Sequence, residues 1–208
     1  AAYQTVSHLS LGELWAFPIS LRLGLIENLR RVAVRIASRR QAQDDGIAWA
    51  ERTLATAERE PRRLINLLAE FADSHPRLSA PFLEEFVARL QGPGPAVVFI
   101  LNWIDQALTE EAATVAQLLQ ADGHTQAAEH LSTTNSIGSL RFLATMGWKT
   151  FVEEQSRVEQ ILRRDPAQAY AAQDFATRDH YRHIVETLAF RSGRSETEVA
   201  QMALELAA

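Results

Sequence analysis

The chain has 208 residues, of which 47% are hydrophobic and 23% are charged, a composition typical of a folded globular protein. It contains no cysteine, which excludes disulfides, zinc–thiolate sites and a cysteine nucleophile within this sequence. The 21 basic and 26 acidic residues give a net charge of −5, which argues against a nucleic-acid-binding surface.

The basic residues are unevenly spread along the chain. Residues 1–43 contain six arginines but only two acidic residues, Glu13 and Glu27. No apolar run reaches the roughly 18 to 20 residues that a transmembrane helix needs. The sequence therefore predicts no membrane span in this chain, together with a basic N-terminal third.

The first helix is predicted from a capping signal followed by a periodic apolar pattern. Ser10 and Glu13 have the spacing of a capping box, in which each side chain accepts a backbone N–H of the other residue. Pro18 is expected to kink or restart this helix because it has no N–H to donate. From Pro18 to Arg40, apolar residues recur every three or four positions and widen beyond one face. We therefore expect this helix to be central and mostly buried.

Turn-forming residues predict further helices in the first half. A second helix is expected to open at Asp44-Asp45-Gly46, a third at Pro61 and a fourth at Ser79. The sequence Gly92-Pro93-Gly94-Pro95 is the clearest break, because neither glycine nor proline continues a helix cheaply. We therefore predict a single helical module over 1–208, with possible layers 1–91 and 95–208.

The second half shows the same helical punctuation and no strand signal. Helices are predicted over 96–108, 110–121, 126–146, 150–163 and 175–191, and after a second capping box at Ser195 and Glu198. This gives about nine to ten helices. The fold class is therefore predicted to be all-α, with the helices in an antiparallel bundle-like array and no sheet.

None of the ionisable residue patterns indicates a catalytic or metal site. His180 and His183, beside Asp179, have the spacing of two metal ligands on one helix, but the sequence indicates no third ligand. The acidic pairs at 110–111 and 153–154 point in different directions on a helix, unlike paired glycosidase carboxylates, and are predicted to lie on solvated faces. We expect no metal or other cofactor in this chain.

The tryptophans and two arginines have a structural and a functional interpretation. Trp15, Trp49, Trp103 and Trp148 lie in apolar periodic segments, which favours core packing over stacking on sugars.

Arg178 and Arg182 are four residues apart, so their like charges repel unless acidic partners surround them. They either form structural ion pairs or grip an anion or the carboxylates of another domain. We predict that their helix packs near the N-terminal helix, with Glu13 or Glu27 as the acidic partner.

Two long stretches resemble the cyclic β-1,2-glucan synthase family. The first, Ser10 to Ala33, reads SLGELWAFPISLRLGLIENLRRVA, and the second, Gln173 to Glu186, reads QDFATRDHYRHIVE. The segment 134–141 and Trp148 resemble a further part of these proteins in the same order, whereas 44–125 match loosely. The family usually has arginine at the position of His180, which further disfavours a metal site there.

The resemblance implies that the chain is a fragment of a very large membrane-bound enzyme that uses UDP-glucose. It is similar to the helical region preceding the glycosyltransferase domain, on the cytoplasmic face of the inner membrane. By this resemblance it is a non-catalytic scaffold or docking module whose partners are other domains of the same chain. The residues in the matching motifs are then structural or interdomain: Glu13, Trp15, Arg22, Glu27, Asn28, Arg30, Arg31, Arg178, Asp179 and Arg182.

A second hypothesis needs no resemblance. The basic N-terminal third is compatible with an autonomous helical adaptor that binds an anionic partner or membrane face. A large exposed apolar patch, with the basic residues on one face, would favour docking.

Overall fold

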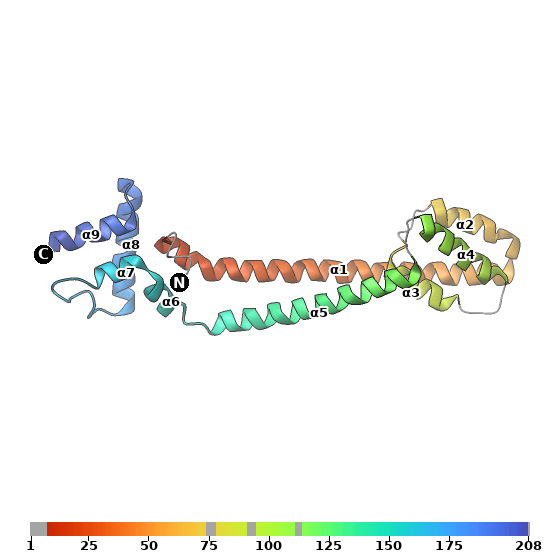
Figure 1. Cartoon of the computed structure of the whole chain (residues 1–208), viewed down its shortest axis with the longest axis horizontal. Helices are drawn as coiled ribbons and strands as arrows, with labels where there is room; N and C mark the ends of the chain where they lie inside the picture. Colours follow the sequence, from red (N-terminus) through yellow and green to blue (C-terminus); the bar gives the residue numbers. More distant parts are fainter. Residues whose placement is uncertain (1–7, 74–77, 91–94, 111–113, 208) are drawn as a thin grey trace. The chain divides into compact units, whose positions relative to one another are not determined.

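The computed structural model describes residues 8–73, 78–90, 95–110 and 114–207. In these ranges the secondary structure is helical and there is no strand, which confirms the all-α class (Figure 1). The helices described are α1 (Leu11–Arg59), the 3-10 helix η2 (Pro61–Arg63), α2 (Leu64–Asp73), α3 (Ala80–Arg89), α4 (Pro95–Glu110), α5 (Val115–Thr145), α6 (Trp148–Gln155), α7 (Arg157–Leu162), α8 (Phe175–Ser192) and α9 (Glu196–Ala207).

These helices form two compact units. The first unit comprises the described residues of 1–26 and 137–208, and the second comprises those of 27–136, so α1 and α5 contribute to both. Each unit takes residues from both sides of the predicted break at Gly92–Pro95, of which residues 92–94 lie outside the described ranges. The single module with layers 1–91 and 95–208 stays a prediction.

Helix α1 is longer than predicted, and the expectation that it is mostly buried is wrong, because Ile19, Leu23 and Val34 on it are more than half exposed. The helix includes Pro18 and continues through Asp44-Asp45-Gly46, so the expected restart and the expected second helix are wrong. A proline near the start of a helix removes one backbone hydrogen bond, while the neighbouring Leu14 is fully buried and holds the turn in place. Packing against α3 likewise outweighs the low helix propensity of Gly46.

Two further predicted boundaries differ from the structure. Gly123 does not end a helix, because α5 continues through it and Asp122 beside it is fixed by an ion pair with Arg39. The predicted helix 150–163 is divided at Ser156, whose extended backbone ends α6 and begins α7. In the first case a tertiary contact outweighs a local helix breaker, and in the second a side-chain cap creates a boundary.

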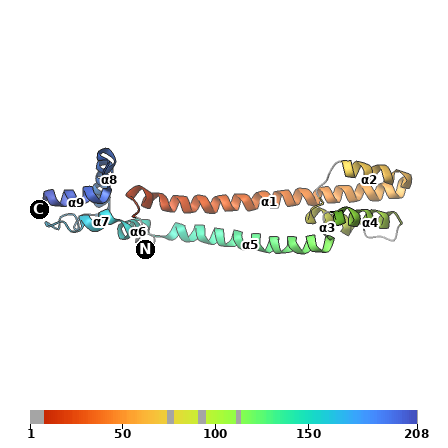
Figure 2. The same ribbon diagram turned by 45° about the horizontal axis from the view of Figure 1, so that its top comes forward.

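Within the second unit, α1 and α5 lie side by side and antiparallel (Figure 2). Asn28 donates hydrogen bonds of 2.9 Å to the hydroxyls of Ser132 and Ser136. Arg35 pairs with Glu129, and Arg39 pairs with Asp122 through an Nη2–Oδ1 distance of 2.7 Å. Along α1 from Asn28 to Arg39, the partner residues on α5 run in the opposite direction, from Ser136 to Asp122. The two helices are therefore antiparallel, as expected for the array.

The core of the second unit is an aromatic cluster centred on Phe71. The Phe71 ring lies 4.9 Å from Trp49 and 5.4 Å from Trp103, edge to face, and 5.8 and 5.9 Å from Phe82 and Phe86. Edge-to-face and offset rings attract each other through their quadrupoles in addition to burying apolar surface. Trp49 and Trp103 thus pack against the core, as predicted.

The first unit joins the start of α1 to the C-terminal helices. Leu11, Leu14 and Val152 form one buried cluster, and a second cluster lies among α7, α8 and α9. Both predicted capping boxes are confirmed: Ser10 N–H donates to Glu13 at 2.8 Å, and Ser195 N–H donates to Glu198 at 2.8 Å. Helix α8 ends at Gly193, whose φ of 68° is left-handed and strain-free only for glycine.

Replacing Gly46 with alanine is expected to destabilise the chain, although alanine usually stabilises a helix interior relative to glycine. A Cβ at Gly46 would lie 2.5 Å from the backbone carbonyl oxygen of Phe82, so α1 and α3 would have to separate. We expect a loss of about 1–3 kcal/mol in the free energy of unfolding, measured by denaturant titration. The matched control is Gly123→Ala on α5, where a Cβ meets no atom within 4 Å, with an expected gain of about 0.5–1 kcal/mol. A gain in both variants would contradict the close helix approach.

Two substitutions of Glu196 distinguish the contribution of its hydrogen bond to stability from that of its charge. Both carboxylate oxygens of Glu196 accept the backbone N–H of Leu11, at 2.9 and 3.2 Å, at the open first turn of α1. Burial and the nearby charges of Glu186 and Glu13 raise the pKa of Glu196, against the lowering effect of the Leu11 N–H. A raised carboxyl pKa contributes stability that is present below the unfolded pKa and is lost as the pH rises through the folded pKa.

We therefore expect Glu196→Gln, which keeps an acceptor without the charge, to be at least as stable as the native chain at pH 7. Glu196→Ala should lose about 1 kcal/mol because the Leu11 N–H loses its acceptor. Thermal unfolding at pH 7 and pH 4 measures this, and the advantage of the glutamine variant should shrink at pH 4. A glutamine variant as unstable as the alanine variant would show that the charge itself is favourable.

Candidate functional site

The most deeply buried charged side chains among the described residues are Arg182 and Glu159. Arg182 on α8 is 0% exposed and Glu159 on α7 is 2% exposed, and the two form an ion pair. Ionised groups are rarely taken out of water unless they are paired and hydrogen-bonded. This pair and the residues around it therefore form the candidate site.

Glu159 is positioned by the helix cap of α7. The Ser156 side chain accepts the backbone N–H of Glu159 at 3.2 Å and so starts the helix at Arg157. Serine followed three residues later by glutamate is the sequence of a capping box. Here, however, the Glu159 carboxylate points to Arg182 and Tyr170 instead of returning to the cap, so it is available for contacts with α8.

The arginines are positioned by the start of α8. Asp174 caps this helix by accepting the backbone N–H of Thr177 at 2.8 Å. One turn further on, Arg178 and Arg182 are four residues apart and lie on the same side of the helix. Both reach the same carboxylate, Glu153 on α6, which places the two like charges against acidic partners.

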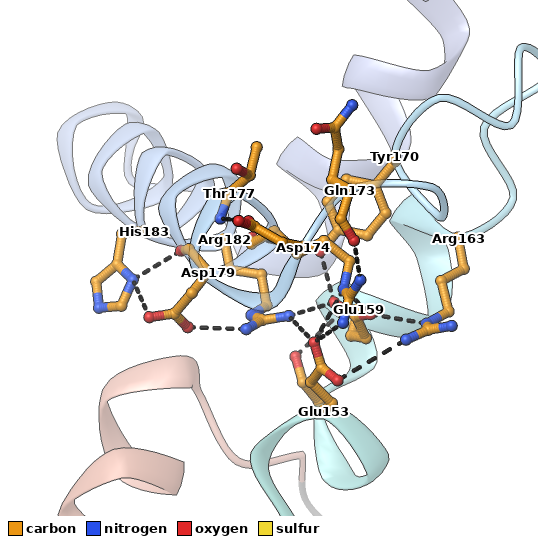
Figure 3. A network of polar contacts seen from close by, with 12 residues as sticks. Glu153, Glu159, Arg163, Tyr170, Gln173, Asp174, Thr177, Asp179, Arg182 and His183 are labelled. Atoms are coloured by element: carbon orange, nitrogen blue, oxygen red, sulfur yellow. Dashed lines mark hydrogen bonds and ion pairs between the residues drawn. The ribbon is translucent and has the colours of Figure 1, made fainter. Parts of the chain in front are cut away.

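The resulting arrangement, which we call the ion network, is drawn in Figure 3. It consists of Glu153, Glu159, Arg163, Arg178, Asp179 and Arg182, together with the hydroxyl of Tyr170. Arg178 Nη2 lies 2.7 Å from Glu153 Oε1, Arg163 Nε lies 2.7 Å from Glu159 Oε1, and Arg182 Nη2 lies 2.8 Å from Asp179 Oδ1. The network thereby links α6, α7 and α8.

The charges of the ion network balance. Three carboxylates and three guanidinium groups cancel, so the network carries no net charge. Burial by itself raises the pKa of Glu159, but hydrogen bonds from Tyr170, Arg182 and Arg163 outweigh burial and leave that pKa below its usual value. Burial and the Glu159 carboxylate together raise the pKa of Tyr170. Glu159 is therefore held as a carboxylate and Tyr170 as a neutral phenol.

An aromatic ring covers one side of the ion network. The guanidinium carbon of Arg182 lies 5.2 Å from the centre of the Phe175 ring, and the Lys149 ammonium lies 5.1 Å from it. Trp15 packs edge-on against the same ring at 6.4 Å. The indole N–H of Trp15 and the Nε of Arg182 are buried without a hydrogen-bond partner in the described part of the chain. Cation–π contacts thus compensate part of the burial of Arg182.

This arrangement is suited to holding helices together. The acidic groups are neutralised by arginines. The Glu159 carboxylate is also nearly inaccessible to solvent, so a substrate could not contact it. A general acid or base needs a pKa near the working pH and contact with its substrate. Neither Glu159, with a lowered pKa, nor Tyr170, with a raised one, meets that requirement.

The residues predicted from the motifs lie in several separate places. Arg178, Asp179 and Arg182 belong to the ion network, and Trp15 contacts Phe175 beside it.

The other motif residues make contacts elsewhere. Glu13 is in its capping box, and Arg22 donates to the Leu143 carbonyl at 3.2 Å. Glu27 pairs with Arg30 at 2.7 Å and with Arg31 at 3.9 Å, whereas Asn28 bonds Ser132 and Ser136. Arg22 and Asn28 thus join α1 to α5, whereas Glu13, Glu27, Arg30 and Arg31 make local contacts along α1.

The predicted acidic partners of Arg178 and Arg182 are wrong. Their carboxylates come from Glu153, Glu159 and Asp179 rather than Glu13 or Glu27, which have local partners of their own. The expected proximity of α8 to the start of α1 is nevertheless present, in the contact of Trp15 with Phe175. The prediction that 153 lies on a solvated face also fails, because Glu153 is largely buried by its arginines.

Glu159 and Tyr170 were not predicted as site residues. The one signal that could have found Glu159 is the capping sequence from Ser156, which fixes a glutamate at the start of a short helix. Nothing local marks Tyr170, whose hydroxyl reaches Glu159 from the segment between α7 and α8.

The histidine pair has ordinary contacts. His183 Nδ1 lies 2.8 Å from the Asp179 carbonyl oxygen, and the His180 ring lies 6.4 Å from that of Tyr181. In the described ranges, no three histidine or acidic side chains are grouped as a metal site would require. Among the same residues, no helix combines the length and the hydropathy required to cross a bilayer.

Fold and ion network together define the class: an all-helical protein region whose buried charges join helices. The chain is 32% identical over 206 residues to the cyclic β-(1,2)-glucan synthase NdvB of Rhizobium meliloti, which it matches over 98% of its own length. It spans 7% of the length of that relative. No protein-family model and no solved structure matches the chain. The similarity confirms the predicted resemblance: nearly the whole of this sequence aligns with one region of that synthase.

Proposed function

We propose that this chain is a non-catalytic helical docking module of a cyclic β-1,2-glucan synthase, against which other domains of the same polypeptide pack. The observation that carries the proposal is an exposed apolar row on α1 in the first unit. Ile19, Leu23 and Ile26 are 59%, 61% and 53% exposed. Their spacing of four and three residues places them on one face of the helix.

This exposed row differs from scattered surface hydrophobics. Isolated exposed apolar side chains are normal, but a contiguous row on one helix face marks an interaction surface. Phe142 on α5 of the same unit is also exposed, at 62%. Burying one large aliphatic side chain is worth roughly 1.5–3 kcal/mol, so three in one row give a partner a substantial driving force.

The ion network supports the non-catalytic part of the proposal. Its acidic groups are paired with arginines, and its most buried carboxylate has a lowered pKa. The name of the relative supports the glucan part. We further propose that the parent enzyme is membrane-bound and transfers glucose from UDP-glucose. In this proposal the module needs no cofactor and lies on the cytoplasmic side of the inner membrane.

The alternative, an adaptor that grips an anionic partner, has less support. In the basic N-terminal third, Arg30 and Arg31 pair with Glu27, while Arg35 and Arg39 pair with acidic residues on α5. A neutralised guanidinium attracts a further anion weakly. Four of the six arginines of this segment are therefore already paired with acidic residues, which disfavours this function.

The docking proposal is tested in the full-length synthase that carries this region. Leu23→Gln combined with Ile26→Gln should lower cyclic glucan output by about tenfold or more, the effect of losing on the order of 1.4 kcal/mol of docking energy. The isolated 208-residue chain with the same changes should keep its helical circular dichroism and its unfolding midpoint. The control is Ser20→Gln, an exposed polar position on the same helix.

Unchanged glucan output in the double variant would overturn the docking role. Release of glucose or glucan from UDP-glucose by the purified 208-residue chain would overturn the non-catalytic role.

A further inference from the structure

We propose that an open cavity in the second unit binds a short stretch of neutral saccharide; its identification as β-1,2-linked glucose rests on the proposed function. The cavity has a volume of about 760 Å³ and is lined by α1, α3 and α5. Sites for small molecules in proteins measure roughly 300–1,000 Å³, so this cavity is large enough for a ligand. Binding of a saccharide to this cavity can be measured without involving the apolar row of α1.

The charges around the cavity favour a neutral ligand. Two arginines line it, and each is already paired: Arg35 with Glu129 and Arg39 with Asp122. The hydrogen bond from Arg39 lowers the pKa of Asp122, so that pair is ionised. With Asp45, the lining holds three carboxylates against two guanidinium groups. A phosphate or nucleotide would find no unpaired cation and a net negative lining.

The polar groups around the cavity favour a ligand rich in hydroxyls. Ser38, Gln41 and Thr125 contribute hydroxyl and amide groups to the lining. The hydroxyl of Ser79 is buried and has no hydrogen-bond partner within the described residues. A buried polar atom without a partner is costly, and a ligand hydroxyl at this position would satisfy it.

Apolar side chains complete the complementarity. Ala42, Trp49, Pro81 and Phe82 line the same cavity as the polar groups. A pyranose ring presents C–H groups on its faces and hydroxyls around its edge, so it needs both kinds of contact. Two other cavities lie in the first unit. One, of about 320 Å³, is mainly apolar and includes Tyr181 and Leu188. The other, of about 460 Å³, is lined mostly by polar and charged residues, among them Glu13, Arg157 and Arg194. The cavity of the second unit combines a tryptophan ring, paired charges and a hydroxyl without a partner among the described residues, so we assign the saccharide to it.

The test is a titration of the 208-residue chain with a β-1,2-linked glucose tetrasaccharide. Binding is measured by backbone NMR chemical shifts and by calorimetry. We expect saturable binding with the largest shifts at Ser38, Gln41, Ser79 and Thr125. Ser38→Trp, which puts a bulky side chain at an exposed position of the cavity lining, should weaken binding by about tenfold or more. Gln41→Ala should weaken it less. Ser20→Gln, in the other unit, should leave it unchanged.

Three results would overturn the saccharide site: no saturable binding, binding that neither cavity variant weakens, or shifts centred on Tyr181 and Leu188. Tighter binding of uridine diphosphate than of the tetrasaccharide would also overturn it. Because this readout is binding to the isolated chain, its failure is distinct from a failure of docking, which is read as glucan output of the Leu23 and Ile26 variants.

Discussion

Arg182→Leu is expected to destabilise the first unit by about 3 kcal/mol or more. Removing one member of a buried ion pair leaves the other charge buried without full compensation, and such losses are typically about 3–5 kcal/mol. Here the group left behind is Glu159, which is 2% exposed and retains Tyr170 and Arg163 as partners. The measurement is denaturant unfolding, with hydrogen exchange in α6 to α8 locating the loss.

Two controls make the Arg182 result specific to the ion pair. Arg191→Leu, an exposed arginine on the same helix, should change stability by no more than about 0.5 kcal/mol. Glu159→Leu combined with Arg182→Leu should cost less than the sum of the single changes, because neither charge is then left unpaired. Additive losses would show that the two residues act independently.

The Arg182 effect should also depend on pH. The pKa of Glu159 is lowered in the folded state, so its stabilising contribution is present above the unfolded pKa and is lost as the pH falls through the folded one. The advantage of the native chain over Arg182→Leu should therefore be largest near pH 7 and shrink below the usual carboxyl pKa of 4.5. An advantage that does not change between pH 7 and pH 3 would contradict the pairing.

Phe71→Ala is expected to cost about 3–5 kcal/mol in the second unit, the range for removing a buried aromatic ring from a packed core. Phe71 is 3% exposed and contacts four other rings, so the truncation leaves a cavity that α2 cannot fill alone. The loss should appear in denaturant unfolding and in the near-ultraviolet circular dichroism of Trp49 and Trp103.

The matched control for Phe71 is Ile65→Ala on the same helix. Ile65 is 69% exposed, so its truncation removes little buried surface and should cost less than about 1 kcal/mol. A similar loss for both variants would show that α2 is held by its helicity rather than by the aromatic cluster.

Local signals predicted the parts of the fold that depend on neighbours in sequence. The boxes at Ser10 and Ser195 involve residues three apart, and Gly193 ends α8 through its own backbone. The length of α1 was not predicted, because Gly46 is held in the helix by packing against Phe82, which no local rule includes.

The candidate site was predicted only in part for the same reason. The like charges of Arg178 and Arg182 indicated that acidic partners must exist. Glu153 lies 25 residues before Arg178, and Glu159 lies 23 residues before Arg182. Both are on helices whose division at Ser156 was not predicted. Identifying them requires the tertiary arrangement, whereas the need for them follows from electrostatics alone.

The hydrogen bond from Leu11 to Glu196 has a consequence for synthesis on the ribosome. The two residues are 185 positions apart, so the first turn of α1 obtains its acceptor only after a further 185 residues have been made. At the usual elongation rates of about 5–20 residues per second, this interval is roughly 10–40 s. During that time the first turn of α1 is capped only by its own Ser10–Glu13 box. The apolar side chains of Leu11 and Leu14 stay exposed until the helix that carries Val152 has been made.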